Sequence, residues 1–418
     1  MKRALLFVVT VGVLLLAAVV TAWPRAEYIA SSSPQAWALS PANIARGAYL
    51  ARAGDCAACH TARGGLPYAG GRALDTPFGR VMAPNITPDA ATGIGAWSAD
   101  DFWNALHNGI SRDGRLLYPA FPYPNYSKVS RADADALFAW LRSLPPQRQA
   151  NRPHLLRFPY DSQAALAGWR LLYFRPGVFE IQATRGAQWN RGAYLVEGLG
   201  HCAACHSPRN GLGASGRGLQ GGLIPVLGWY APSLASNDPH LAQLLHTGVS
   251  PGGAVAGPMA DVVGQSLQHL SGPDIGAMAA YLASLPADSA PPQPAAPPPE
   301  PVMQLGRKLY EQHCADCHGK NGLGAAGEDG APAYPPLAGN RTLRLQAPVN
   351  AIRIVLSGGF APSTAGNPRP YGMPPYSQLL DDTEAAAVVS YVRASWGNAA
   401  PMVTPAEVNG YRAVPLEP

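Results

Sequence analysis

The chain has 418 residues, and its 31 lysines and arginines against 26 aspartates and glutamates give a net charge of +5. That excess is too small for a typical nucleic-acid-binding protein. Hydrophobic residues form 47% of the chain, which excludes wholesale disorder. The 45 glycines and 43 prolines, without long alternating strand patterns, predict a mainly α fold of short helices and long loops, and the length corresponds to roughly three domains.

Residues 1–24 form a hydrophobic N-terminal segment. Lys2 and Arg3 precede the uncharged stretch 4–23, which is long enough to cross a bilayer as a helix. A retained membrane anchor and a cleaved signal peptide both fit this pattern, and the length favours the anchor. Either interpretation predicts that the rest of the chain lies on the periplasmic side of the inner membrane.

Three modules with the same order of elements follow, at residues 38–145, 189–286 and 302–418. Each begins with a predicted helix that leads into a Cys-x-x-Cys-His motif, and each contains a predicted amphipathic helix near its end. The residues expected to cap these later helices are Ser130, Ser271 and Asp381, each with an acidic residue three positions further on. The third module ends in a C-terminal tail.

Two connections of different character separate the modules. Residues 146–188 have an aromatic middle, Gly168 to Phe174, and are expected to form a packed connection. Residues 287–301 are rich in proline and predict a semi-rigid, extended linker.

The three motifs use all six cysteines of the chain. In such a motif two thiols add to the vinyl groups of haem, and the adjacent histidine coordinates the iron. Zinc binding, a disulfide framework and a thioredoxin-like pair fit less well, because the motifs lie far apart and each pair is followed by histidine. The sequence therefore predicts three covalent haem c groups, held by Cys56, Cys59 and His60, by Cys202, Cys205 and His206, and by Cys314, Cys317 and His318.

Methionine is the usual sixth ligand of the iron in electron carriers. Met259 and Met373 follow His206 and His318 at closely similar separations and are the predicted ligands there. In the first module the equivalent position is Phe121, which cannot bind iron. Three alternatives remain for that haem: Met82, His107, or an open or water-bound site.

With these motifs behind a hydrophobic N-terminal segment, the chain resembles the triheme cytochrome c subunits of bacterial membrane-bound dehydrogenases, which act on alcohols, gluconate, fructose or aldehydes. The most specific stretches are Thr76–Gly79, Asn85–Asp89, Thr92–Ser98 and Gly257–Val263. The resemblance implies three tandem class I-like cytochrome c domains.

The resemblance also implies a function. The expected protein is an electron-transfer subunit, not an enzyme by itself, that passes electrons from a periplasmic catalytic subunit to ubiquinone. Phe121 and its neighbours favour an aldehyde dehydrogenase partner with molybdopterin and iron–sulfur centres, and a quinoprotein alcohol dehydrogenase is the next choice. The alternative function is a haem enzyme, such as a peroxidase, that uses an open first haem.

Overall fold

The computed structural model of the protein describes residues 3, 9–10, 12–14, 37–216, 218–286, 295–327 and 332–414. Most of the predicted anchor and most of the proline-rich linker lie outside these residues. Among the helices that the structure does describe, none is both long and apolar enough to cross a membrane.

The chain forms two compact units. The first unit contains Met1–Gln182, Val196–His201 and Gly211–Ala214, and the second contains Ala183–Leu195, Cys202–Asn210 and Ser215–Pro418. Helices dominate the described part of both units, as the composition predicted, and the strands occur in short antiparallel sheets.

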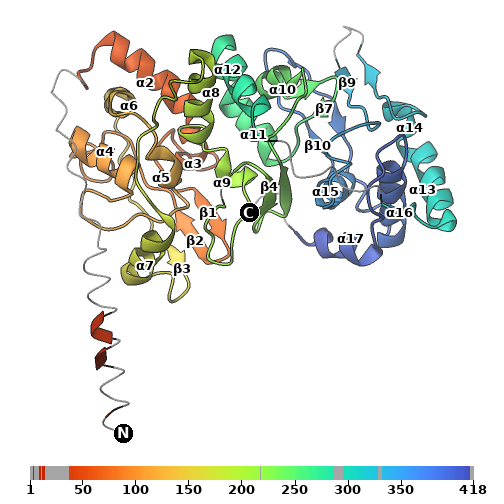
Figure 1. The fold of residues 1–418 in the computed structure, drawn as a ribbon, viewed down its shortest axis with the longest axis horizontal. Coiled ribbons are helices and arrows are strands. Elements are labelled where there is room, and N and C mark those ends of the chain that lie inside the picture. Colours follow the sequence, from red (N-terminus) through yellow and green to blue (C-terminus); the bar gives the residue numbers. More distant parts are fainter. Residues whose placement is uncertain are drawn as a thin grey trace. The chain divides into compact units, whose positions relative to one another are not determined.

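The elements follow one another in chain order (Figure 1). Those up to Tyr173 are α2 (Pro41–Ala53), α3 (Cys56–His60), β1 (Ala73–Thr76), β2 (Gly79–Met82), α4 (Ala99–Asn108), α5 (Tyr123–Tyr126), α6 (Arg131–Ser143), β3 (Leu155–Leu156) and α7 (Gln163–Tyr173). Those of the middle of the chain are α8 (Ala187–Glu197), α9 (Ala203–His206), β4 (Gly221–Ile224), β5 (Trp229–Pro232), α10 (Leu241–Thr247), β6 (Val249–Ser250), β7 (Gly253–Ala254), α11 (Pro258–Gln265), a 3-10 helix (Leu267–His269) and α12 (Gly272–Ala283). Those that follow are α13 (Glu300–His313), α14 (Ala315–His318), β8 (Ala325–Ala326), β9 (Pro332–Tyr334), α15 (Val349–Ser357), β10 (Gly359–Phe360), β11 (Gly372–Met373), α16 (Asp382–Ala394) and α17 (Pro405–Arg412).

A close crossing of two helices recurs in all three modules. The helix before each Cys-x-x-Cys-His motif carries a glycine at the point where it meets the module's later helix. A Cβ at any of these glycines would lie only 2.0–2.4 Å from a carbonyl oxygen of that helix, so only glycine allows the contact. The pairs are Gly47 with Ala136, Gly192 with Ala277, and Gly306 with Ala387.

The three later helices begin where the sequence predicted. The side chains of Ser130, Ser271 and Asp381 accept hydrogen bonds from the backbone amides three residues on. In the first two modules the acidic residue three positions after the cap also pairs with an arginine of the crossing helix. These pairs are Asp133 with Arg46 and Asp274 with Arg191.

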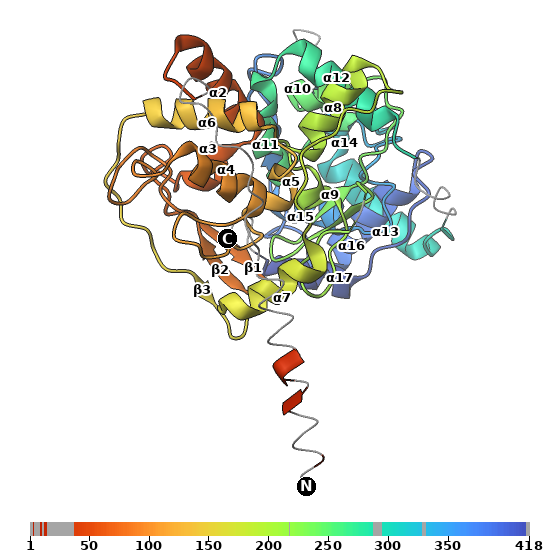
Figure 2. The ribbon, with the colours of Figure 1, turned by 60° about the vertical axis from the view of Figure 1, so that its left-hand side comes forward.

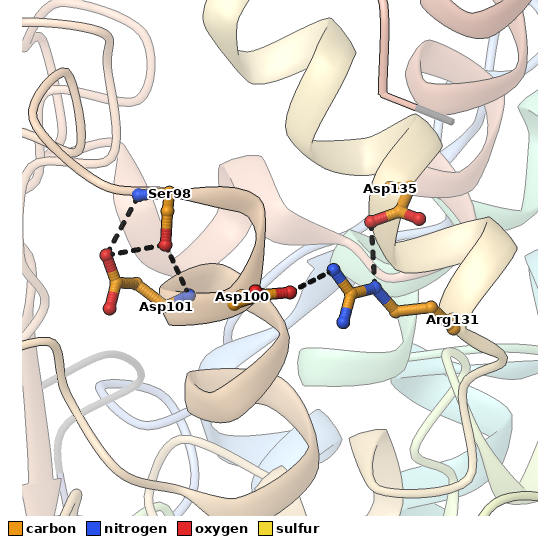
Figure 3. Close-up of polar contacts among 5 residues, drawn as sticks. All are labelled: Ser98, Asp100, Asp101, Arg131 and Asp135. Carbon is orange, nitrogen blue, oxygen red and sulfur yellow. Dashed lines mark hydrogen bonds and ion pairs between the residues drawn. The ribbon is translucent and has the colours of Figure 1, made fainter. Parts of the chain in front are cut away.

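Helix α4 is fastened to α6 by charged side chains (Figure 3). Ser98 and Asp101 form a capping box at the start of α4. Arg131 of α6 pairs with Asp100 of α4 and with Asp135, one turn further along α6. These contacts hold α4 in place, and the loop that follows α4 carries Phe121.

Helix α7, in the connection between the first two modules, packs within the first unit. Its Leu166 and Ala167 join a buried cluster with Ile110 and Leu116. The buried Arg170 donates a hydrogen bond to the carbonyl of Asn108 and lies over the ring of Tyr123. The connection is thus anchored beside the loop that contains Phe121.

Candidate haem-binding sites

Each Cys-x-x-Cys-His motif forms one turn of helix after a longer one. The histidine ends α3, α9 or α14. No disulfide joins any two of the six cysteines, all of which lie in the described ranges. A single helical turn places two thiols and an imidazole on one side of the backbone, which suits two thioether bonds and one iron ligand.

The three motif histidines share one hydrogen bond. In each, Nδ1 lies 2.6–2.9 Å from a proline carbonyl oxygen: His60 with Pro84, His206 with Pro232, and His318 with Pro335. A carbonyl only accepts, so Nδ1 carries the proton and Nε2 keeps its lone pair. Metal-binding histidines are oriented in this way by a backbone carbonyl. The arrangement therefore prepares Nε2 as an iron ligand at all three motifs.

Burial keeps these groups uncharged. Desolvation lowers the pKa of His60, His206 and His318, although the bond to the proline carbonyl opposes the shift. Burial also raises the pKa of the Cys56 and Cys202 thiols to about 12 and that of Cys314 to about 11. A covalent haem c is held by two uncharged thioethers and one neutral imidazole, so the uncharged state of these side chains fits that group.

Two buried tryptophans carry unused hydrogen-bond donors. The indole N–H groups of Trp103 and Trp229 have no hydrogen-bond partner among the described residues. Trp103 belongs to the hydrophobic cluster against which Cys56 packs. Trp229 begins β5, the strand that ends at Pro232. A buried donor without a partner is costly, so both donors fit the presence of a haem, whose carboxylates accept hydrogen bonds.

The candidate sixth ligands occupy comparable places in the three modules. A middle helix ends at a glycine with positive φ, a short antiparallel pairing follows, and the candidate residue lies in or just beyond it. The sets are α4, Gly109 and Phe121; α10, Gly248 and Met259; and α15, Gly358 and Met373. Met259 and Met373 are both half-buried. The structure therefore places Phe121 where the other two modules have methionine.

Phe121 packs beside the first motif. Together with Cys56 it packs against the buried cluster that includes Leu50 and Trp103. Its ring lies 5.3 Å from that of Tyr126, whose hydroxyl donates to the carbonyl of Gly54, two residues before Cys56. Phe121 therefore lies beside the first Cys-x-x-Cys-His motif but supplies no donor atom.

Met82 and His107, the other candidates in the first module, are both buried. Met82 ends β2, two residues before Pro84, and its backbone N–H donates to Nδ1 of His154. His107 lies in α4, stacks on Trp103 and bonds through Nδ1 to the carbonyl of Ser127.

Two features of these sites went unrecognised in the sequence. One is the set of proline carbonyls, which lie 24, 26 and 17 residues from their histidines and are marked by no local sequence pattern. The other feature is His201, the residue before Cys202. It belongs to the first unit, where it bonds to the backbone of Gly54 and lies 5.6 Å from the Tyr126 ring. His201 thus packs within the first unit, beside the segment that leads into the first motif.

Comparison with known proteins agrees with this geometry. A family model described as Cytochrome c matches residues 44–145 and 303–396. The chain is 39% identical to the gluconate 2-dehydrogenase cytochrome c subunit of Pantoea cypripedii, over 85% of this chain and 86% of that protein. It is 36% identical to the cytochrome c subunit of the quinone alcohol dehydrogenase of Gluconacetobacter polyoxogenes, over 88% and 84%.

A third relative has a different length. The chain is 42% identical to a nicotinate dehydrogenase subunit of Pseudomonas putida over 89% of its own residues, but it spans only 32% of that protein. The similarity to the two cytochrome c subunits, in contrast, runs over most of both chains. This protein therefore belongs to the family of cytochrome c subunits of bacterial dehydrogenases.

Proposed function

We propose that the chain carries three covalent haem c groups in three cytochrome c domains and serves as the electron-transfer subunit of a periplasmic, membrane-bound dehydrogenase. The observation that supports this most is the hydrogen bond from each motif histidine to a proline carbonyl. It occurs at the second motif as well, which the family model does not cover.

The roles of the residues follow from their positions. The paired cysteines attach each haem, and His60, His206 and His318 coordinate the irons through Nε2. Met259 and Met373 supply the sixth ligands of the second and third haems. A bound haem c exchanges one electron between its ferric and ferrous states. The chain has to hold the ligands in place and exclude water while this occurs.

Met82 is the remaining methionine candidate at the first haem, but its position favours other ligation. It lies two residues from the carbonyl that binds Nδ1 of His60. Nδ1 points away from the iron, so this strand lies on the histidine side. The sixth ligand has to come from the side of the iron opposite His60. In the other two modules the candidate for that role is methionine, and the first module has Phe121 at the corresponding position. We infer that the first haem differs electronically from the other two.

The contacts between the second and third modules, which lie within the second unit, link the two proposed haem sites. The side chain of Asn350 in α15 makes two hydrogen bonds of 2.8 Å to the backbone of Tyr230 in β5. Arg353, one turn further along α15, lies 5.0 Å from the ring of Trp229. The third module thus supports the strand whose Pro232 accepts the hydrogen bond from His206.

The same tryptophan supports the Met259 loop. Gly257 has positive φ, and a Cβ there would lie 2.6 Å from the Trp229 ring. Gly257 is two residues before Met259, so its close packing on Trp229 helps to fix the backbone from which the Met259 side chain extends. Through β5 and Trp229, α15 therefore supports both the strand that ends at Pro232 and the loop that carries Met259, the two segments that would hold the ligands of a second haem.

The relatives and the Phe121 region bear on the catalytic partner. The Phe121 region and the 42% identity to the nicotinate dehydrogenase subunit favour a partner with molybdopterin and iron–sulfur centres, such as an aldehyde or N-heterocycle dehydrogenase. The relatives that belong to quinone alcohol dehydrogenases support a quinoprotein alcohol dehydrogenase partner.

Two electrons from the substrate would pass singly through the haems, and ubiquinone would take up both with two protons.

Purification of the intact complex through a tag on this chain tests the function. We expect a copurifying subunit that contains molybdenum and iron–sulfur centres, reduction of the haem bands when its substrate is added, and reoxidation by a soluble ubiquinone analogue. A protein that purifies without a dehydrogenase and turns over peroxide rapidly by itself would instead be the alternative haem enzyme.

Replacement of the candidate ligands tests the haem sites. Met259→Ala and Met373→Ala should each abolish the methionine-to-iron charge-transfer band of one haem and lower its potential by on the order of 0.1 V, a fraction of the roughly 0.8 V that axial ligation spans. Met82→Ala should leave all charge-transfer bands in place. Potentiometric titration and near-infrared spectra provide the measurement. A charge-transfer band lost in Met82→Ala would show that Met82 is a ligand.

Arg353→Met tests the link between the second and third modules. A cation–π contact contributes roughly 1 kcal/mol, so its loss should allow imidazole to displace Met259 at about fivefold lower concentration. The third haem should keep its affinity for imidazole. Arg344→Met, an exposed arginine of the same module, is the matched control. Equal displacement curves for both variants and the wild type would refute the coupling.

A further inference from the structure

An exposed apolar surface on the first unit takes no part in the haem sites. Its most exposed side chains are Phe158, Leu172 and Leu155, with 85%, 67% and 60% of their surface accessible. They come from β3, the loop after it and α7, which lie beside one another in both Figure 1 and Figure 2. Scattered exposed hydrophobic residues are normal, so the question is whether these form one surface.

A chain of side-chain contacts connects the two ends of this surface. Tyr160, two residues after Phe158, packs on Phe78 with ring centroids 4.5 Å apart. Phe78 lies against Gly213, where a Cβ would be 2.7 Å from its ring. The neighbouring carbonyl of Leu212 accepts a hydrogen bond from the indole of Trp169, which lies 5.5 Å from Tyr173. These contacts link Tyr160, in the loop that carries Phe158, to Tyr173 at the end of α7.

Two exposed arginines lie at its ends. Arg157 precedes Phe158 and donates to the carbonyl of Pro77. Arg175 follows α7 and donates to the carbonyls of Leu171 and Phe174. Tryptophan, tyrosine and arginine beside exposed aliphatic side chains are typical of surfaces at the lipid–water interface, where the rings enter the headgroup region and guanidinium groups meet phosphates.

We propose that this surface, from Phe158 through Phe78 and Trp169 to Leu172 and Tyr173, rests on a bilayer that contains anionic phospholipid. The proposal rests on the membrane location in the proposed function and adds a second contact to the N-terminal segment. Phosphate headgroups complement the arginines, and the acyl boundary complements the exposed leucine and phenylalanine side chains.

The contact has a consequence for the first haem. Strand β2 begins at Gly79, next to Phe78 in this surface, and leads to Pro84, the hydrogen-bond acceptor of His60. Six residues of extended chain span at most about 20 Å. The bilayer contact would therefore hold the first haem close to the membrane, where ubiquinone is dissolved.

Oxidative footprinting of the full haem-loaded chain tests the proposal. The chain is placed in vesicles of phosphatidylethanolamine and phosphatidylglycerol, in vesicles of phosphatidylcholine, or in detergent without lipid. Hydroxyl-radical oxidation of Phe158, Leu172 and Tyr173 should fall several-fold in the anionic vesicles relative to detergent. Oxidation of Phe360, a phenylalanine of the second unit with 69% exposure, should not change.

Substitutions in this surface test the bilayer contact separately from the N-terminal segment and from electron transfer. Phe158→Asp combined with Leu172→Asp should abolish the protection of Tyr173, whereas Phe360→Asp should not alter it. Haem spectra and substrate-driven reduction, recorded on the same samples, report on the proposed function independently. Equal oxidation in detergent and in anionic vesicles would overturn the proposal. So would protection that appears only when the catalytic subunit is added without lipid, because the surface would then bind protein.

Discussion

The hydrogen bond between each motif histidine and a proline carbonyl is the contact on which the proposed haem sites depend. It fixes the tautomer and the direction of the imidazole, and it has to be present before Nε2 becomes a defined iron ligand. The glycine crossings, the helix caps and the arginine–aspartate pairs hold the surrounding helices, so that the motif turn and the proline segment meet. Three different local sequences reach the same arrangement, which is the strongest structural sign that the chain repeats one kind of site.

The modules differ in the residue at the position of the candidate sixth ligand. Met259 and Met373 follow comparable helix, glycine and strand arrangements, whereas the first module has Phe121 in the corresponding place. An electron carrier gains from unequal sites, because a haem with another ligand has another potential. The link through Asn350, Arg353 and Trp229 adds a second asymmetry, since it supports the proposed second haem site from the third module.

Local sequence patterns predicted much of this architecture. The short apolar helices and the caps at Ser130, Ser271 and Asp381 are present, because capping and helical periodicity act over a few residues. The mainly helical fold also follows from composition. The haem ligands themselves were predicted from the motif chemistry, and their coordination remains a proposal.

Other features could not be predicted, because they join residues far apart in the chain. Nothing in the residues around Trp229 indicates that Arg353 lies over its ring, and a proline carbonyl has no sequence pattern of its own. The exposed surface around α7 was expected only to be packed, since an aromatic stretch alone does not show which rings face solvent. The predicted anchor lies largely outside the described residues and stays a prediction.

The number of attached haems tests the central claim most directly. Intact-mass measurement of the fully matured protein should show the mass of the polypeptide plus three haem groups, and peptide mapping should locate one on each cysteine pair. The decisive site is Cys202 and Cys205, because the second module rests on the shared geometry without a match to the family model. A mature protein with only two haems, and unmodified thiols at this pair, would contradict the account.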